Sequence, residues 1–398
     1  NQRRGRSARR HLGVAVKPEY AHRPDTGSIE RGIGGMESGS NADGTEPSHR
    51  VGNETRPQAA VRGSLYAAPV AATMSSSRGA GVLLGMACGD ALGRPVEFES
   101  PGTIRSRHGR VTEMLAEGTH RQPAGTITDD TELGLCIARS LVAHEGFVPA
   151  AVADRFVGWY ASDPFDVGRL TASALRRLDA GGSWETVGIE DWKHLPEGQN
   201  AGNGSVMRCA PYGVAFAADE SALVTASRVS SALTHADPRC QWSCVVLNAT
   251  IAGLLRDTER PLADAIDVAA QAPDAVLEAA RSVESVLSGE ADPDNLELEN
   301  GGYVVTTLQA GLFCGLTAET AADAIVDAVM LGGDTDTIGT VAGAVAGARF
   351  GADALPKRWL GAIDESDELE ALGAALAAGS FDVDSTAEAV YAEGSLDL

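Results

Sequence analysis

The run Gly332-Gly333-Asp334-Thr335-Asp336-Thr337 leads directly into the almost uncharged stretch IGTVAGAVAGARFG at 338–351. Small and apolar residues on all sides of a helical pattern predict a helix that is deeply buried. Two carboxylates and two hydroxyls therefore crowd one turn at the start of that helix. An Asp or Thr is a common N-cap, but one cap accounts for only one Asp. The second Asp adds repulsion unless a cation compensates it, so capping and metal binding both stay open here.

A second run of the same kind, Thr126-Ile127-Thr128-Asp129-Asp130-Thr131-Glu132, enters the apolar stretch LGLCIARSLVA. Adjacent Asp side chains point in different directions, so one can bridge two cations while its neighbour ligates one of them. Oxygen ligands without a His/Cys cluster at zinc spacing favour Mg²⁺ or Mn²⁺. Two such runs can converge in a bundle, where sites are built from facing helices. Together they favour metal binding over two unrelated caps.

Four other features are weaker signals. Glu97 follows a Gly/Pro helix end, and spacing alone favours a solvated loop carboxylate there. Asp90, inside the preceding apolar helix, is interpreted as a structural hydrogen-bond acceptor. The glycine-rich turn 202–208 opens a helix and offers backbone N–H groups to phosphate oxygens, although a plain turn is the commoner explanation. His235 stands at a helix end, where capping or packing is its ordinary role.

Helical spacing dominates from residue 78 onward, and strand-like alternation is scarce. The hydrophobic share of 43% with only 5% aromatic residues also suits close-packed helices of small residues. The stretches 183–199 and 287–301 are expected to be loops. The pattern predicts an all-α protein with helices over 79–92, 130–144, 149–161, 168–179, 205–217, 219–233, 239–256, 260–287, 303–315, 318–330 and 337–350.

The chain carries 55 Asp+Glu against 32 Lys+Arg, a formal net charge of -23. This balance disfavours nucleic acid as a partner and is interpreted as the solvated surface of a salt-adapted, halophilic cytoplasmic protein. The six cysteines form no CxxC pair, so buried reduced thiols are expected. No charge-free apolar run is long enough to cross a membrane, so no membrane association is expected.

Composition divides the chain into three parts. Residues 1–73 are basic, rich in Gly, Arg, Ser and Pro, and without periodicity, so we expect a disordered or non-native extension. Met74 opens the first apolar pattern and is our hypothesis for the natural start; a genuine flexible extension is the alternative. Residues 74–378 are expected to form the catalytic domain, and 379–398 an acidic C-terminal tail.

Five segments, in this order between about 81 and 360, resemble the ADP-ribosylglycohydrolase family, which includes the activating glycohydrolases of dinitrogenase reductase. They are GMACGDALGRPVEF, TITDDTELG, GNGSVMRCAPYG, THADPRC and LGGDTDTIGTVAGAVAGARFG. The TDDT and GGDTDTIG pair is the most specific. Residues 1–73 have no counterpart in the family, and the loop 183–199 matches no pattern we recognise. The resemblance implies an all-α, compact single-domain orthogonal helical bundle.

The resemblance also implies a binuclear Mg²⁺ or Mn²⁺ centre at the base of a cleft. Carried over by position, its ligands would be Thr128, Asp129, Asp130, Asp334, Asp336 and Thr337, with Asp336 bridging. Glu97 or Asp129 would be the catalytic proton acceptor. The ADP-ribose pocket would be lined by Asn203, Gly204, Ser205 and His235.

The expected activity is metal-dependent removal of ADP-ribose from a modified protein side chain or small molecule, with a water as the attacking group. Two alternatives belong to other classes. One is a non-catalytic ADP-ribose binder or structural relative, since some jellyfish lens crystallins resemble this fold. The other is an unrelated metal-dependent phosphohydrolase. The acceptor, the choice between Mg²⁺ and Mn²⁺ and the oligomeric state stay open.

Overall fold

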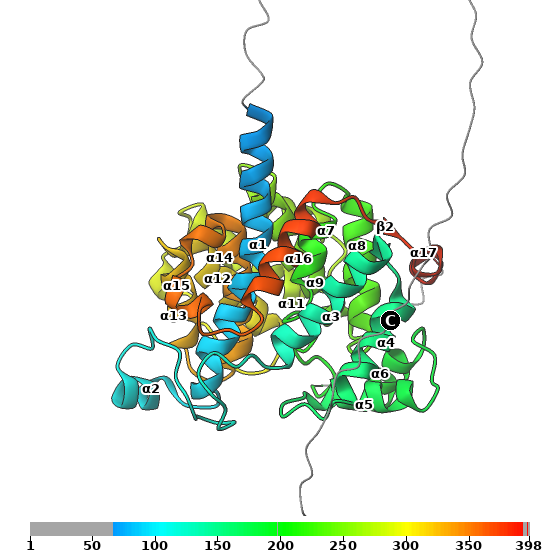
Figure 1. Cartoon of the computed structure of the whole chain (residues 1–398), viewed down its shortest axis with the longest axis horizontal. Helices are drawn as coiled ribbons and strands as arrows, with labels where there is room; N and C mark the ends of the chain where they lie inside the picture. The colour runs from blue at the N-terminus through cyan, green and yellow to red at the C-terminus, as the bar shows by residue number, and fades with distance from the viewer. Residues whose placement is uncertain (1–66, 197, 393–395, 397–398) are drawn as a thin grey trace, which may run out of the picture. The chain divides into compact units, whose positions relative to one another are not determined.

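The computed structural model describes residues 67–196, 198–392 and 396, and these belong to one compact unit (Figure 1). Helices make up nearly all of the regular structure, which confirms the predicted all-α class. In chain order the elements are α1 Ala67–Gly93, η1 Arg94–Val96, α2 Pro101–His108, α3 Asp129–His144, β1 Gly146–Phe147, α4 Pro149–Tyr160, α5 Arg169–Asp179, α6 Val187–His194, α7 Ala210–Ala215, α8 Glu220–Ala232, α9 Pro238–Leu255, α10 Pro261–Val268, α11 Asp274–Leu287, η2 Pro293–Asn295, α12 Val304–Thr317, α13 Ala321–Val329, α14 Thr335–Phe350, η3 Ala352–Ala354, α15 Lys357–Leu360, α16 Ser366–Ala378, β2 Asp382–Val383 and α17 Ser385–Ala392.

Helices α1 and α14 form the centre of the fold, and their glycines let the two backbones touch. Glycine recurs every fourth residue along one face of each helix, at 81, 85, 89 and 93 in α1 and at 339, 343 and 347 in α14. A Cβ atom added to Gly85 would overlap the carbonyl oxygen of Gly343, and one added to Gly89 would overlap that of Gly339. Such close antiparallel packing sets the C-terminal end of α1 directly beside the N-terminal end of α14.

Other helices surround this pair. In Figure 1, α1 runs between α14 and α16, and α14 also packs against α12 and α13. The buried helix predicted from the run at 338–351 is confirmed, because Thr335 to Ala348 of α14 are all buried. The core is therefore built on the stretch of sequence with the fewest charges.

Several helix boundaries differ from the prediction. The expected helix 260–287 is two helices, because Pro273 has no N–H to donate and begins α11 after a break. The expected helix 205–217 is reduced to α7, since residues 204–208 form a turn. The stretch 183–199, expected to be a loop, contains α6. Helix α1 begins at Ala67, before Met74, while residues 1–66 lie outside the described part of the chain.

The segment 379–398, expected to be an acidic tail, contains β2 and α17 in its described part. The two-residue strand β2 pairs in parallel with β1, with Gly146 opposite Asp382. Ala387 of α17 is buried, and the Leu396 carbonyl accepts a hydrogen bond from Gln241 at 3.3 Å. Among the described helices, none is long and apolar enough to cross a membrane.

Candidate active site

The start of α14 is held by a glycine pair that no other residue could replace easily. Gly332 and Gly333 both have a φ of 72°, in the left-handed region that favours glycine. A Cβ atom on Gly333 would also overlap the backbone oxygen of Asn300. The backbone of Gly333 forms two hydrogen bonds with the segment after α1, from Phe98 N at 2.7 Å and to Glu99 O at 2.9 Å. Glu97 is thereby tied close to the first turn of α14.

The start of α3 is held by Asp90, a carboxylate that is fully buried in α1. Asp90 accepts hydrogen bonds from the backbone N–H of Thr128 at 2.9 Å and from the hydroxyl of Thr131 at 2.6 Å. It also accepts from the Thr128 hydroxyl at 3.0 Å. The interpretation of Asp90 as a structural acceptor is confirmed. Its bonds place the Asp129–Asp130 pair of α3 beside the C-terminal end of α1.

Helix capping does not explain why several carboxylates stand at the starts of α3 and α14. Thr128 is the N-cap of α3 and accepts from Asp130 N at 3.4 Å. Asp334 occupies the N-cap position of α14, yet its side chain forms no capping hydrogen bond within the described residues. Asp130 Oδ1 is buried and has no hydrogen-bond partner in the described part of the chain. Capping therefore accounts for Thr128 but not for the carboxylates.

These carboxyl groups lie buried and close together, and the surrounding residues do not offset the negative charge of their ionised forms. One carboxylate oxygen from each of Glu97, Asp334 and Asp336 lies within 4.8 Å of the others. Burial and then the neighbouring carboxylates raise the pKa of Glu97 to about 9 and that of Asp129 to about 8. The same causes hold the pKa values of Asp130 and Asp336 well above the ordinary range.

Arg94 is the nearby buried cation, but its guanidinium is engaged elsewhere. Its nitrogens donate to the backbone carbonyls of Thr126 at 3.0 Å, Glu117 at 3.1 Å and Pro123 at 2.8 Å. Buried carboxylates without a cation are costly. The side-chain ligand atoms of Glu97, Asp334 and Asp336 are all oxygens, so this cluster fits a hard divalent cation such as Mg²⁺ or Mn²⁺.

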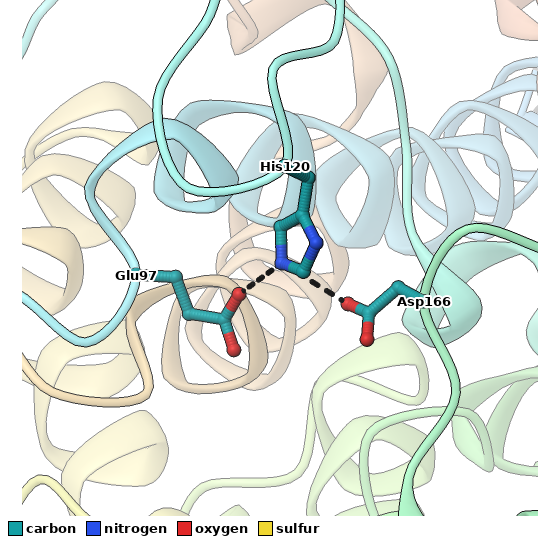
Figure 2. Close-up of side chains that lie close together, drawn as sticks. All are labelled: Glu97, His120 and Asp166. Atoms are coloured by element: carbon teal, nitrogen blue, oxygen red, sulfur yellow. Dashed lines mark hydrogen bonds and ion pairs between the residues drawn. The ribbon is translucent and has the colours of Figure 1, made fainter. Parts of the chain in front are cut away.

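Two residues of the site were missed in the sequence, His120 and Asp166. Figure 2 shows His120 between Glu97 and Asp166, with His120 Nε2 at 2.6 Å from Glu97 Oε2 and 3.5 Å from Asp166 Oδ2. Both residues lie on loops, where a single His or Asp gives no periodic signal. The interpretation of Glu97 as a solvated carboxylate is wrong, because Glu97 is only 6% exposed.

A cavity of about 330 Å³ opens onto this cluster. On its lining lie six carboxyl groups, together with the turn after α6 and one histidine: Glu97, Asp129, Asp130, Asp166, Asp334, Asp336, Gly202, Asn203, Gly204 and His235. The metal-ligand candidate Thr337 lines the cavity too. Thr128 does not, because its hydroxyl points to Asp90 and Asp130. Most of the residues singled out in the sequence therefore meet in one place.

The glycine-rich turn packs directly on the histidine. A Cβ atom on Gly204 would lie 2.8 Å from His235 Cε1, so only glycine fits there. Asn203 Nδ2 donates to Asp334 Oδ2 at 2.8 Å, which joins the turn to the acidic cluster. Burial and the nearby Arg208 lower the pKa of His235 to about 3, so its ring is neutral. Ser205 does not line the cavity; its hydroxyl accepts a hydrogen bond from Ser231 at 2.9 Å.

The sequence profile of one family, described as ADP-ribosylglycohydrolase, matches residues 71–385. The chain belongs to the ADP-ribosylglycohydrolase family. It is 31% identical to the ADP-ribosyl-[dinitrogen reductase] glycohydrolase of Rhodospirillum rubrum, over 74% of this chain and 92% of that one. It is also 31% identical to the ADP-ribosylarginine hydrolase Tri1 of Pseudomonas putida, over 74% of this chain and 76% of that one.

A solved structure gives the same result for the fold. The chain resembles a protein of an "ADP-ribosylglycohydrolase-related protein complex" with a TM-score of 0.63 and 32% identity, over 77% of this chain and 98% of that one. Membership of the ADP-ribosylglycohydrolase family confirms the expected class of enzyme, a hydrolase that removes ADP-ribose. The name of the first relative gives a modified protein, dinitrogen reductase, and the name of the second gives a modified side chain, arginine.

Proposed function

We propose that the protein hydrolyses the bond between ADP-ribose and an arginine side chain, using a binuclear Mg²⁺ or Mn²⁺ centre. The proposed ligands are Asp129, Asp130, Asp334, Asp336 and Thr337, which line the cavity, together with Thr128, whose hydroxyl lies 3.3 Å from Asp130 Oδ2. The observation that carries this proposal is the meeting of two carboxylate clusters, from the starts of α3 and α14, in one cavity. Their raised pKa values indicate unmatched charge, which two divalent cations would offset.

Bound cations would hold the ribose hydroxyls and polarise the attacking water. The residues of the chain have separate tasks. Glu97 or Asp129 would accept the proton of the water, since both line the cavity and bound cations would favour their ionised forms. His120 holds the Glu97 carboxylate in place through its 2.6 Å contact. Asp90 fixes the start of α3, on which Asp129 depends.

The opposite wall would bind the ADP-ribose. Gly202 and Gly204 have no side chains, so their backbone can approach a diphosphate closely. The neutral His235 ring packs behind Gly204 and shapes this wall. Asn203 contributes a side-chain amide that already touches Asp334, so substrate and metal ligands are held in one network. The Ser205 hydroxyl is bonded to Ser231 and would stabilise the turn without contacting the ligand.

Charge favours a cationic acceptor. Six carboxyl groups line the cavity, and two divalent cations would neutralise four negative charges. Of the described residues that line it, Arg169 is the one permanently charged cation. A guanidinium suits the remaining negative charge better than a neutral serine does. The name of the Pseudomonas putida relative, ADP-ribosylarginine hydrolase, supports the same choice.

All six cysteines are free and buried, and we therefore propose the reducing cytoplasm as the site of reaction.

The test is incubation with defined ADP-ribosyl-arginine and ADP-ribosyl-serine peptides in the presence of Mg²⁺ or Mn²⁺. We expect free ADP-ribose from the arginine peptide, with little from the serine peptide. The matched control is Asp336→Asn, which keeps the shape of the side chain but removes a ligand charge and should abolish turnover. Release of inorganic phosphate instead of ADP-ribose, or full activity in excess chelator, would contradict the proposal.

A further inference from the structure

Phe98 is an exposed aromatic residue at the edge of the cavity, directly after Glu97. Its side chain is 72% exposed, the highest value among the large hydrophobic residues that the structure describes. Exposing an aromatic ring to water forgoes the free energy that its burial would give. Phe98 also lines the cavity that holds the carboxylates. The ring is therefore open to the same solvent space as the reacting groups.

The backbone of Phe98 is strained as well. Its φ is 63°, a left-handed conformation that bulky residues rarely adopt. Two contacts hold it there: Phe98 N donates to Gly333 O at 2.7 Å, and the Thr119 hydroxyl donates to the neighbouring Glu97 carbonyl at 2.8 Å. Strain of this kind persists where the surrounding structure enforces it, and it gathers at ligand sites. A ring that is both strained and solvent-exposed contributes little to packing, so a role in binding explains it better.

The surroundings of Phe98 indicate which chemistry it meets. An aromatic face attracts cations, and the attraction grows when negative groups stand nearby and water is excluded. Phe98 follows Glu97 in the chain, and both line the cavity together with Asp166, which His120 links to Glu97. An aromatic ring beside carboxylates is the arrangement that binds a guanidinium, with the ring against its flat face and the carboxylates at its edge.

We propose that Phe98 is a specificity-determining residue, whose ring stacks on the guanidinium of the arginine from which ADP-ribose is removed. This inference rests on the proposed function. The acceptor is bonded to the reacting ribose carbon, so it must lie beside Glu97, where Phe98 also lies. The adenosine, by contrast, is separated from that carbon by the diphosphate, which would lie against the wall formed by Gly202, Gly204 and His235.

The experiment uses the full chain and four variants, with free ADP-ribosyl-arginine and ADP-ribosyl-serine as substrates. Phe98→Ala removes the ring, Phe98→Leu keeps an apolar side chain without a π face, and Phe98→Tyr restores the face. Leu287→Ala, which changes an exposed residue on α11 that is 40% exposed, is the matched control. The readouts are kcat/KM for each substrate and the Kd for ADP-ribose, measured by calorimetry with Mg²⁺ present.

We expect Phe98→Ala and Phe98→Leu to lower kcat/KM for ADP-ribosyl-arginine by about 3- to 30-fold, the range of cation–π contacts from exposed to desolvated sites. Phe98→Tyr should stay close to the wild type, as should Leu287→Ala. The Kd for ADP-ribose and any slow turnover of ADP-ribosyl-serine should change by less than about twofold in all variants, because neither involves a guanidinium.

Three results would overturn the inference while leaving the proposed function intact. An equal loss of ADP-ribose affinity would mean that the ring binds adenosine. Wild-type behaviour of Phe98→Leu would mean that any apolar side chain suffices. Unchanged kcat/KM in Phe98→Ala would mean that the ring has no part in binding this acceptor. Failure of the proposed function gives a different pattern, since the wild type itself would then release no ADP-ribose from ADP-ribosyl-arginine.

Discussion

At the scale of single residues, Asp90 shows how a carboxylate that binds no substrate can still organise the site. It is 0% exposed, and burial raises its pKa to about 6 despite the hydrogen bonds that favour the ionised form. Its oxygens accept from both the backbone and the hydroxyl groups of Thr128 and Thr131. The turn that carries Asp129 and Asp130 therefore depends on a residue of a different helix.

We predict that Asp90→Asn impairs both folding stability and metal binding. An amide NH₂ in place of one carboxylate oxygen leaves at least one buried donor without an acceptor, which costs about 1–3 kcal/mol. Metal affinity should fall as well, because the start of α3 is no longer fixed. Asp219→Ala is the control, since Asp219 caps α8 away from the site and its loss should lower stability alone. Thermal melts and Mn²⁺ titrations of both variants measure this; unchanged Mn²⁺ affinity in Asp90→Asn would contradict it.

The raised pKa values give a prediction about pH. Glu97 and Asp129 ionise at about 9 and about 8 in the folded chain without metal, but near 4 when unfolded. Between these values the folded state binds more protons than the unfolded state. Each group therefore stabilises the fold fully below about pH 4, and this contribution is lost as the pH rises toward 8 or 9.

In chelator, the free energy of unfolding should fall with rising pH by up to about 1.4 kcal/mol per pH unit for each such group. Asp129→Asn should show a shallower fall between pH 5 and 8, because its amide does not titrate. Saturating Mn²⁺ should also flatten the curve, since cations favour the ionised carboxylates. Denaturant unfolding across this pH range is the measurement. Identical slopes for the wild type and Asp129→Asn would show that Asp129 is not protonated in the folded chain.

At the scale of helices, the contact between α1 and α14 positions the whole site. Four glycines of α1 and three of α14 alternate along one line of contact, and backbone atoms fill the space that side chains would occupy elsewhere. Asp90 and Glu97 lie at one end of this contact, beside the first turn of α14. A change in the spacing of the two helices would therefore move metal ligands as well as core residues.

We predict that Gly85→Val severely destabilises the protein, by about 3 kcal/mol or more, because its side chain would overlap the backbone of Gly343. The control is Gly158→Ala in α4, where an added Cβ meets nothing within 4 Å. That change should raise stability by about 0.5–1 kcal/mol, since alanine is the better helix former. Denaturant unfolding of both variants tests the pair. A loss of much less than about 3 kcal/mol in Gly85→Val would show that α1 and α14 can move apart without a large loss of stability.

The parts of the site that could be predicted from the sequence are those where acidic residues cluster next to an apolar helix. The acidic runs at 126–132 and 332–337 stand out because each enters an apolar helix. The structure brings both runs to one cavity. His120 and Asp166 could not be found in this way. The loop of His120 is positioned by the hydrogen bonds of Arg94 to its carbonyls, and such contacts leave no periodic pattern in a sequence.

Some helix boundaries could not be predicted from the sequence either. The break between α10 and α11 rests on one proline within an otherwise helical pattern, and helix α6 is short, so its apolar positions are too few to show a period.

The burial of the Glu97 side chain could not be predicted from the sequence either. Glu97 is buried, and the backbone of the two residues after it is hydrogen-bonded to Gly333, which lies more than 200 residues away in the sequence. Local spacing contains no information about such a contact.

At the scale of the whole molecule, the site exists only when three distant segments meet: the end of α1, the start of α3 and the start of α14. Cations that bind the starts of α3 and α14 together stabilise the folded chain over the unfolded one, so metal binding and folding must be coupled. If Asp129 and Asp336 belong to the same centre, their effects on metal binding should also be strongly non-additive, because residues that share a site act as a unit.

The most direct measurement is therefore a set of thermal melts of the wild type, Asp129→Ala, Asp336→Ala and the double variant, each with and without Mg²⁺ or Mn²⁺. A shared binuclear centre predicts that the cations raise the Tm of the wild type, that either single substitution removes most of this increase, and that the double variant is little worse than either. A wild-type Tm that is indifferent to both cations, with additive losses of about 0.5–2 kcal/mol per substitution as for two separate helix caps, would contradict it.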